Sequence, residues 1–181
     1  MRKGLFNPDT ALGDVLRLWW EELQGVGEFK EKKAKTADRA ELRRASTVED
    51  VMLLPSFQRA CLRFRPFFQG RGEGEWERSV ERLAIILGLL AQVREHTDQV
   101  LPLQMASQIQ GDKPVVSELR FRRLVQRDRL ELYQAMSRVL PLLGNKANIY
   151  ALANDMYYWG KDVKREWAFS YFPNTPAIKT A

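Results

Sequence analysis

Arginines are the residues whose type and spacing suggest specific chemistry in this sequence. Residues 117–129 read SELRFRRLVQRDR, and at 3.6 residues per turn Arg120, Arg123 and Arg127 recur on one side of a helix. Phe121 and its apolar neighbours fall on the other side, which predicts one buried face. A guanidinium group is planar and always charged, so it can form two parallel hydrogen bonds with a phosphate group. The row therefore favours phosphate binding, with a solvated helix face as the alternative.

Nearby carboxylates can neutralise only part of this arginine-rich segment. Glu118 precedes Arg122 by four residues and Asp128 adjoins Arg127, so each pair could contribute some ion-pair energy. The row itself is nevertheless expected to remain uncompensated.

A second arginine group lies in the N-terminal half of the chain. Arg39 and Arg43 share one face of a helix, and Arg44 follows them. Two separated groups of this kind could form a continuous track along a nucleic-acid backbone. Such contacts are largely insensitive to base sequence and weaken strongly as salt is raised.

Side chains that usually catalyse reactions or bind metals are scarce. The chain has one histidine, His96, expected at the end of a helix, and one cysteine, Cys61, whose apolar neighbours predict a buried thiol. The glycines of GRGEGE, residues 70–75, lack the strand and helix that flank a phosphate-binding loop. Acidic residues are scattered among basic ones rather than grouped as in a two-metal nuclease. The sequence therefore predicts no enzyme, no cofactor and no metal site.

Aromatic residues are concentrated near the C-terminus, where they could stack on the bases of a single strand. Their helical spacing is more typical of a core, and we expect most of them to be buried. They are Tyr150, Tyr157, Tyr158, Trp159, Trp167, Phe169, Tyr171 and Phe172.

The composition predicts a folded, basic, cytoplasmic protein. Its 181 residues are 45% hydrophobic, with a formal net charge of +6 and a sequence pI of about 9.6. Excess Lys and Arg attract polyanions, so nucleic acid and anionic membranes are candidate partners, with simple solubility as the alternative. Arg2 and Lys3 precede no apolar region, and the longest apolar stretch, residues 83–91, is shorter than the roughly 20 residues of a membrane span. Neither a signal peptide nor a membrane partner is expected.

Helical periodicity recurs through the chain, and no segment alternates as a strand does. Asp9 or Thr10 can cap the first helix and Gly25 can end it. Gly88 lies inside the most apolar helix, where it would let another helix approach closely. In the N-terminal half, helices are expected over 10–24, in a short segment that ends at 44, from 46 or 47 to 54, over 56–64 and over 76–96. In the C-terminal half, they are expected over 117–128, from there to 143, and over 148–171.

A change of composition at residues 110–114 suggests a boundary, because Gly111 and Pro114 interrupt the helical pattern. The expected fold class is all-α, with two small helical bundles joined by a short loop. Residues 1–110 would form an N-terminal bundle with a basic linker at 30–35, and residues 111–181 would form a C-terminal bundle with the arginine-rich helix.

Several stretches together resemble a known family. They are ELRRAS at 41–46, LPSFQRA at 54–60, SELRFRRLVQRDR at 117–129, LANDMYYWG at 152–160 with Lys161 and Trp167 after it, and an N-terminal helix with Trp19 and Trp20. In these features the chain is similar to CasB, the small subunit of the type I-E CRISPR Cascade surveillance complex.

This resemblance implies a function and a set of partners. It implies a subunit present as a pair, together with the other Cascade subunits, in a crRNA-guided complex. There it would contact the target and displaced DNA strands and help to hold open the R-loop, in which guide RNA pairs with one DNA strand. The residues to which the resemblance assigns this role are Arg43, Arg44, Arg120, Arg123 and Arg127, followed by Lys161 and Lys164.

Three other functions remain open at this stage. A helix-turn-helix DNA-binding regulator would place residues 121–132 near a turn, with arginines aimed at the major groove. A structural adaptor would use the basic faces to bind acidic protein partners. A nuclease would reveal itself by metal-dependent cleavage.

Overall fold

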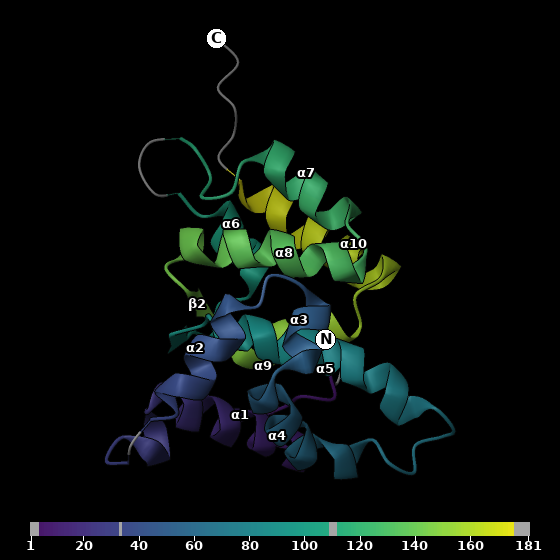
Figure 1. Ribbon diagram of the computed structural model, residues 1–181. Helices are drawn as coiled ribbons and strands as arrows, with labels where there is room; N and C mark the ends of the chain where they lie inside the picture. Colours follow the sequence, from purple (N-terminus) through teal and green to yellow (C-terminus); the bar gives the residue numbers. More distant parts are fainter. Residues whose placement is uncertain (1–3, 33, 109–111, 176–181) are drawn as a thin grey trace.

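The computed structural model describes residues 4–32, 34–108 and 112–175, and in this part of the chain the fold is all-α, as expected (Figure 1). Four short 3-10 helices and two two-residue strands accompany the α-helices. The α-helices are α1 (Ala11–Gln24), α2 (Thr36–Arg44), α3 (Val48–Leu53), α4 (Pro55–Phe64), α5 (Glu75–Leu90), α6 (Leu101–Ala106), α7 (Glu118–Gln126), α8 (Arg129–Val139), α9 (Ile149–Tyr157) and α10 (Lys161–Tyr171).

Figure 1 separates the described helices into an upper and a lower group, and whether these are the two small bundles expected remains a prediction. Figure 1 shows α6, α7, α8 and α10 in its upper part and α1 to α5 with α9 in its lower part. The grouping departs from sequence order, because α6 packs against α10 while α9 packs against α5 and α1. Gln110 and Gly111, on which the expected boundary depends, lie outside the described residues. The division into 1–110 and 111–181 remains a prediction.

Helix α5 forms the centre of the core, as its apolar sequence predicts. Every residue from Leu83 to Leu90 is buried. A Cβ added at Gly88 would lie 2.9 Å from the hydroxyl oxygen of Tyr133 on α8 and 3.1 Å from a methyl carbon of Val51 on α3. The expected close approach at Gly88 is therefore confirmed.

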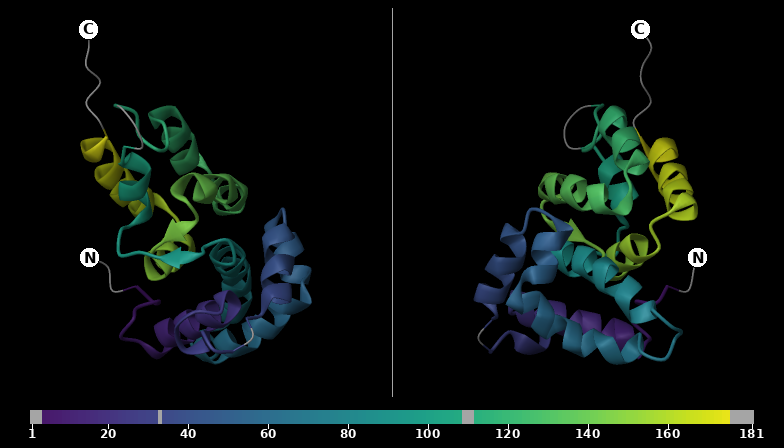
Figure 2. Two further views of the ribbon diagram at one scale, coloured as in Figure 1. Left: turned by 90° about the vertical axis from the view of Figure 1, so that its left-hand side faces the viewer. Right: turned by 45° about the vertical axis from the view of Figure 1, so that its right-hand side comes forward.

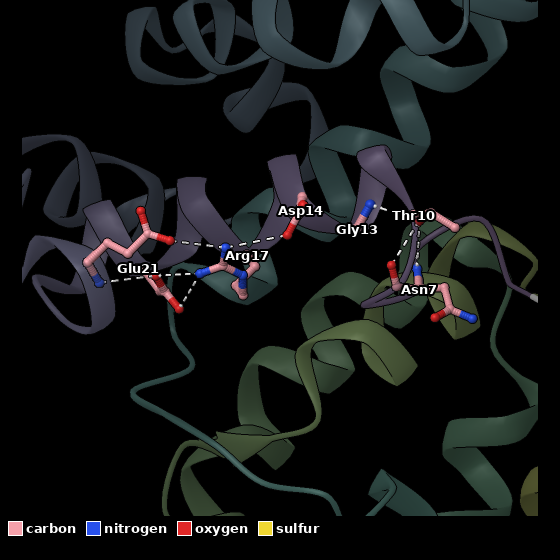
Figure 3. Close-up of polar contacts among 7 residues, drawn as sticks. Asn7, Thr10, Gly13, Asp14, Arg17 and Glu21 are labelled. Carbon is pink, nitrogen blue, oxygen red and sulfur yellow. Dashed lines mark hydrogen bonds and ion pairs between the residues drawn. The ribbon is translucent and has the colours of Figure 1, made fainter.

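Helix α1 begins and ends where its sequence predicts. The Thr10 hydroxyl accepts a hydrogen bond from the Gly13 amide at 3.1 Å and donates to the Asn7 carbonyl at 2.8 Å (Figure 3). Gly25 ends the helix in the left-handed conformation, with φ of 68°.

On the exposed side of α1, carboxylates compensate the positive charge of Arg17. The Arg17 guanidinium bonds Glu21 at 3.0 Å and Asp14 at 3.4 Å (Figure 3), and also contacts Glu28 at 3.3 Å. Its hydrogen bond to Glu21 is the main reason that the Arg17 pKa is raised. This is a solvated helix face of the ordinary kind.

Two expectations about the chain after α5 are wrong. The helix ends at Leu90 rather than at His96, and the expected absence of strands is contradicted by β1 (Glu95–His96), which pairs in parallel with β2 (Lys146–Ala147). His96 therefore ends no helix; its Nδ1 accepts a hydrogen bond from the amide of Ile149, the first residue of α9, at 3.3 Å. Strands of only two residues, paired between distant segments, are too short to leave a periodic pattern in the sequence.

The expected C-terminal helix over 148–171 is in fact two helices. It breaks between Tyr157 and Lys161, where Gly160 is fully extended. Helix α6 was missed altogether, although Pro102 at its second position is a typical helix-start residue.

Two buried tyrosines predict a loss of stability at alkaline pH. Burial raises the pKa values of Tyr133 and Tyr171 to about 12. Between pH 10 and 12 the unfolded chain loses these protons while the folded chain keeps them. The free energy of unfolding should therefore fall with pH by about 1.4 kcal/mol per pH unit for each tyrosine. Urea titrations between pH 8 and 12 should show a shallower fall for Tyr133→Phe and Tyr171→Phe; an unchanged slope would contradict the prediction.

Candidate nucleic-acid interface

Helix α7 is fixed to the protein by its apolar side. The Ser117 hydroxyl caps it, as predicted, by accepting a hydrogen bond from the Arg120 amide at 3.4 Å. Phe121 is fully buried and stacks on Tyr171 of α10, with ring centroids 3.8 Å apart. Leu124 is also buried on this side. The opposite side of α7 consequently faces solvent.

Two arginines on the solvent side of α7 have no carboxylate partner among the described residues. Arg120 and Arg123 are exposed, and neither side chain forms an ion pair or hydrogen bond with the described residues. Arg122 between them differs, because it pairs with Glu118 at 3.6 Å, as the four-residue spacing suggested. Unlike the face of α1 around Arg17, this face therefore has uncompensated positive charge.

The third member expected in the row, Arg127, is placed differently. Helix α7 ends at Gln126, and Asp128 caps α8 by accepting a hydrogen bond from the Glu131 amide at 2.9 Å. Arg127 lies between the two helices with extended backbone and pairs with Glu131 at 3.4 Å. The expectation of three uncompensated arginines on one helix is therefore wrong. A contact between Arg127 and nucleic acid remains a prediction.

The two candidate lysines differ in their surroundings. Lys161 is exposed at the first position of α10. Lys164 is half-buried; its ammonium group donates to the Arg127 carbonyl at 2.8 Å and lies 5.5 Å from the centre of the Trp159 ring. Lys164 therefore helps to join α10 to the turn between α7 and α8, and it is the one candidate that the structure brings against another, Arg127.

The second arginine group lies at the end of α2. Arg43 and Arg44 are exposed, whereas Arg39 is half-buried and donates from Nε to the Ala91 carbonyl at 3.3 Å. The end of α2 also contacts α8, where the Tyr133 hydroxyl donates to the Ala45 carbonyl at 3.1 Å. In both Figure 1 and Figure 2, α8 lies between α7 and α2. The two arginine groups are thus on different helices, separated by α8.

Two further arginines, Arg94 and Arg129, were not predicted to have a role. Arg129 is half-buried and donates to the carbonyls of Tyr157 at 3.4 Å and Trp159 at 3.1 Å, so it closes the end of α9. Arg94 is exposed in the loop after α5. Arg129 follows a capping signal, Asp128 with Glu131, that the sequence does contain. No local pattern marks Arg94, because only the fold brings its loop next to α2.

Within the described part of the chain, the side chains that most often bind metals or react as nucleophiles are placed as follows. No group of three His, Cys, Asp or Glu side chains there could hold a metal ion. The Cys61 thiol is buried, as expected, and burial raises its pKa to about 12. A pocket of about 740 Å³ contains His96 together with Asp98 and Glu166, and its acidic lining is unsuited to phosphate. Among the described helices, none has the length and apolarity needed to cross a bilayer.

Half of the eight C-terminal aromatic residues belong to the core, fewer than their spacing predicted, and Tyr158, Phe169 and Phe172 are exposed. Tyr157, Trp159, Trp167 and Tyr171 are buried. Phe169 is the clearest exception, with 73% of its surface exposed. Stacking on bases is therefore open only to the exposed rings.

Comparisons with known proteins agree with the helical fold and with the sequence resemblance. The chain is similar in fold to a chain in the crystal structure of E. coli Cascade bound to a PAM-containing dsDNA target, with a TM-score of 0.63 and 18% sequence identity. The match covers 88% of this chain and 95% of the other. No curated protein sequence matches. The pattern of CRISPR-associated protein Cse2, the family also called CasB, matches residues 38–172, and since this is well over half of the chain, the protein belongs to the Cse2 family.

Proposed function

We propose that this chain is a non-catalytic subunit of a crRNA-guided Cascade complex and stabilises the R-loop by contacting the target and displaced DNA strands. The observation that carries the proposal is that Arg120 and Arg123 on α7 are exposed and pair with none of the residues that the structure describes. Its partners would be the other Cascade subunits, crRNA, target DNA and a second copy of the chain. Family membership and the fold shared with a chain of a DNA-bound Cascade support this assignment.

The physical basis of the function is a small bias on a balanced reaction. Exchange of a DNA duplex for an RNA–DNA heteroduplex is close to neutral in free energy, so a few protein contacts with the backbone can shift it. Arg120 and Arg123 would contact phosphate groups without reading bases, and guide pairing would supply the sequence specificity. Arg43, Arg44 and Lys161 are exposed and would add contacts. Arg127 and Lys164 would contribute less, because both already have partners within the protein.

The proposal is tested in a reconstituted complex. The chain is co-expressed with Cascade subunits that lack the small subunit, and R-loop formation on matched target DNA is measured as salt is raised. We expect Arg120→Gln with Arg123→Gln to weaken R-loop formation and to reduce its salt slope by roughly 0.7 to 0.9 per lost phosphate contact. Arg165→Gln is the matched control, because Arg165 is an exposed arginine that already pairs with Asp162 at 3.3 Å.

The outcomes separate this function from its alternatives. If the double variant supports the R-loop as well as wild type does, phosphate contact through α7 is wrong. Wild-type protein that joins the complex without affecting DNA would instead indicate a structural adaptor, and metal-dependent cleavage would indicate a nuclease. A helix-turn-helix regulator is disfavoured because α8, the helix after the turn, buries Leu132, Tyr133 and Met136 and ties its first arginine to the end of α9.

A further inference from the structure

The loop that follows α5 is held rigidly against three other elements. The Trp20 indole on α1 donates to the Val93 carbonyl at 3.1 Å, and Arg39 on α2 donates to the Ala91 carbonyl at 3.3 Å. The Arg94 amide donates to the Asn145 carbonyl at 2.8 Å, in the turn before β2. The backbone that carries Arg94 is therefore fixed beside the face of α2 that carries Arg39 and, one turn later, Arg43.

This arrangement concentrates positive charge without a carboxylate to balance it. Neither Arg43 nor Arg94 forms a side-chain ion pair or hydrogen bond with the described residues, and both are exposed. The Nη2 atom of Arg39 is buried without a hydrogen-bond partner. Burial and the positive charges of Arg43 and Arg94 lower the Arg39 pKa. The acid nearest in sequence to Arg94, Glu95, pairs with Lys146 at 2.9 Å.

We propose that Arg39, Arg43 and Arg94 form an arginine seat that binds a phosphate group of the nucleic-acid backbone. Arg43 and Arg94 make the contacts, and Arg39 adds positive potential from beneath them. The proposal rests on the proposed function and deepens it, because it gives the bound strand a second contact point across α8 from Arg120 and Arg123. Arg94 enters the interface only through the fold.

Phosphate fits this seat better than a protein carboxylate does. Guanidinium groups from two different elements can donate to the two charged oxygens of a backbone phosphate, but a carboxylate also has two oxygens, so the number of acceptors does not separate them. The difference is that a strand presents one phosphate after another. A polyanion also releases bound counterions when several phosphates are neutralised together, which a single acidic side chain does not. An acidic protein segment is therefore the alternative outcome of the test.

The seat is tested with the full chain and a fluorescein-labelled 20-nucleotide single strand. Binding is measured by anisotropy between 50 and 200 mM KCl for wild type, Arg43→Gln, Arg94→Gln, Arg120→Gln with Arg123→Gln, and the Arg165→Gln control. We expect Arg43→Gln and Arg94→Gln each to weaken binding and to lower the salt slope by about 0.7, the value for one single-strand phosphate contact. The same variants are then compared for R-loop formation in the reconstituted complex.

The two proposals fail in distinguishable ways. If the α7 double variant weakens binding and R-loop formation while Arg43→Gln and Arg94→Gln match wild type in both, the seat is wrong and the proposed function stands. If wild-type protein neither binds the strand nor alters the R-loop, both are wrong. If the seat variants bind DNA normally but no longer join the complex, the seat binds an acidic protein segment and the phosphate assignment is overturned.

Discussion

Replacement of Tyr133 by alanine is expected to lower the free energy of unfolding by about 4 kcal/mol, the usual cost of removing a large buried aromatic side chain. Tyr133 is fully buried, and its ring lies against Gly88 in the middle of α5. Its hydroxyl donates to the Ala45 carbonyl at 3.1 Å and so also ties the end of α2 to α8. One side chain thus joins the two groups of helices. Urea unfolding followed by circular dichroism measures the loss.

A matched variant separates the packing of Tyr133 from its hydrogen bond. Tyr133→Phe keeps the ring and removes only the hydroxyl, so we expect a loss of about 1 kcal/mol. Gly88→Ala tests the same contact from the other side, because its new methyl group would push into the ring. If Tyr133→Ala and Tyr133→Phe cost the same, the ring does not hold the two groups of helices together.

The sequence predicted most of the fold because helix signals are local. A hydroxyl cap at Thr10 or Ser117 and a left-handed glycine at Gly25 act within one turn of the helix they delimit. Gly88 could be recognised because a glycine in an otherwise apolar helix has few purposes other than close packing. These local signals do not show which helices pack together. For example, α9 packs against α5 although the two are far apart in the sequence.

The errors have identifiable physical causes. The pairing of His96 with Ala147 is non-local and too short to leave a pattern. The end of α7 could have been recognised, because Asp128 and Glu131 form the spacing of a capping box and start a new helix at Arg129. Two helices were expected here, but the first was expected to run through about Asp128, so it wrongly took in Arg127, whereas α7 ends at Gln126.

The candidate interface was predictable in its residue types but not in its charge balance. Sequence spacing identified Arg120 and Arg123, and the structure places both in solvent, with no side-chain partner in the described parts of the chain. The pair of Arg127 with Glu131 has the same four-residue spacing as Glu118 with Arg122, so sequence spacing could have revealed it, but it was not predicted. Sequence spacing could not associate Arg94 with Arg43, which lie far apart in sequence. Electrostatic compensation depends on side chains that meet in the fold.

Replacement of Phe121 by alanine is expected to cost about 4 kcal/mol of unfolding free energy and to abolish the function of α7 while leaving every arginine in place. Phe121 stacks on Tyr171 with ring centroids 3.8 Å apart and meets Phe172 edge-on at 5.5 Å, so it packs α7 against the end of α10. Without Phe121, α7 would no longer hold Arg120 and Arg123 in a fixed position. DNA binding would then have to order both side chains, and this loss of entropy would weaken binding.

Phe121→Leu is the matched control, because it keeps most of the buried volume and loses mainly the aromatic stacking, about 1 kcal/mol. Under conditions of salt and temperature in which the α5 amides remain protected, the α7 amides of Phe121→Ala should exchange their hydrogens faster than those of wild type. R-loop formation should then fall in Phe121→Ala as far as in Arg120→Gln with Arg123→Gln, although only the latter keeps wild-type stability. Wild-type R-loop formation by a destabilised Phe121→Ala would mean that the position of α7 does not matter. The two arginines would then act through their charge alone, and the proposed bidentate contact with phosphate, which needs a fixed geometry, would be wrong.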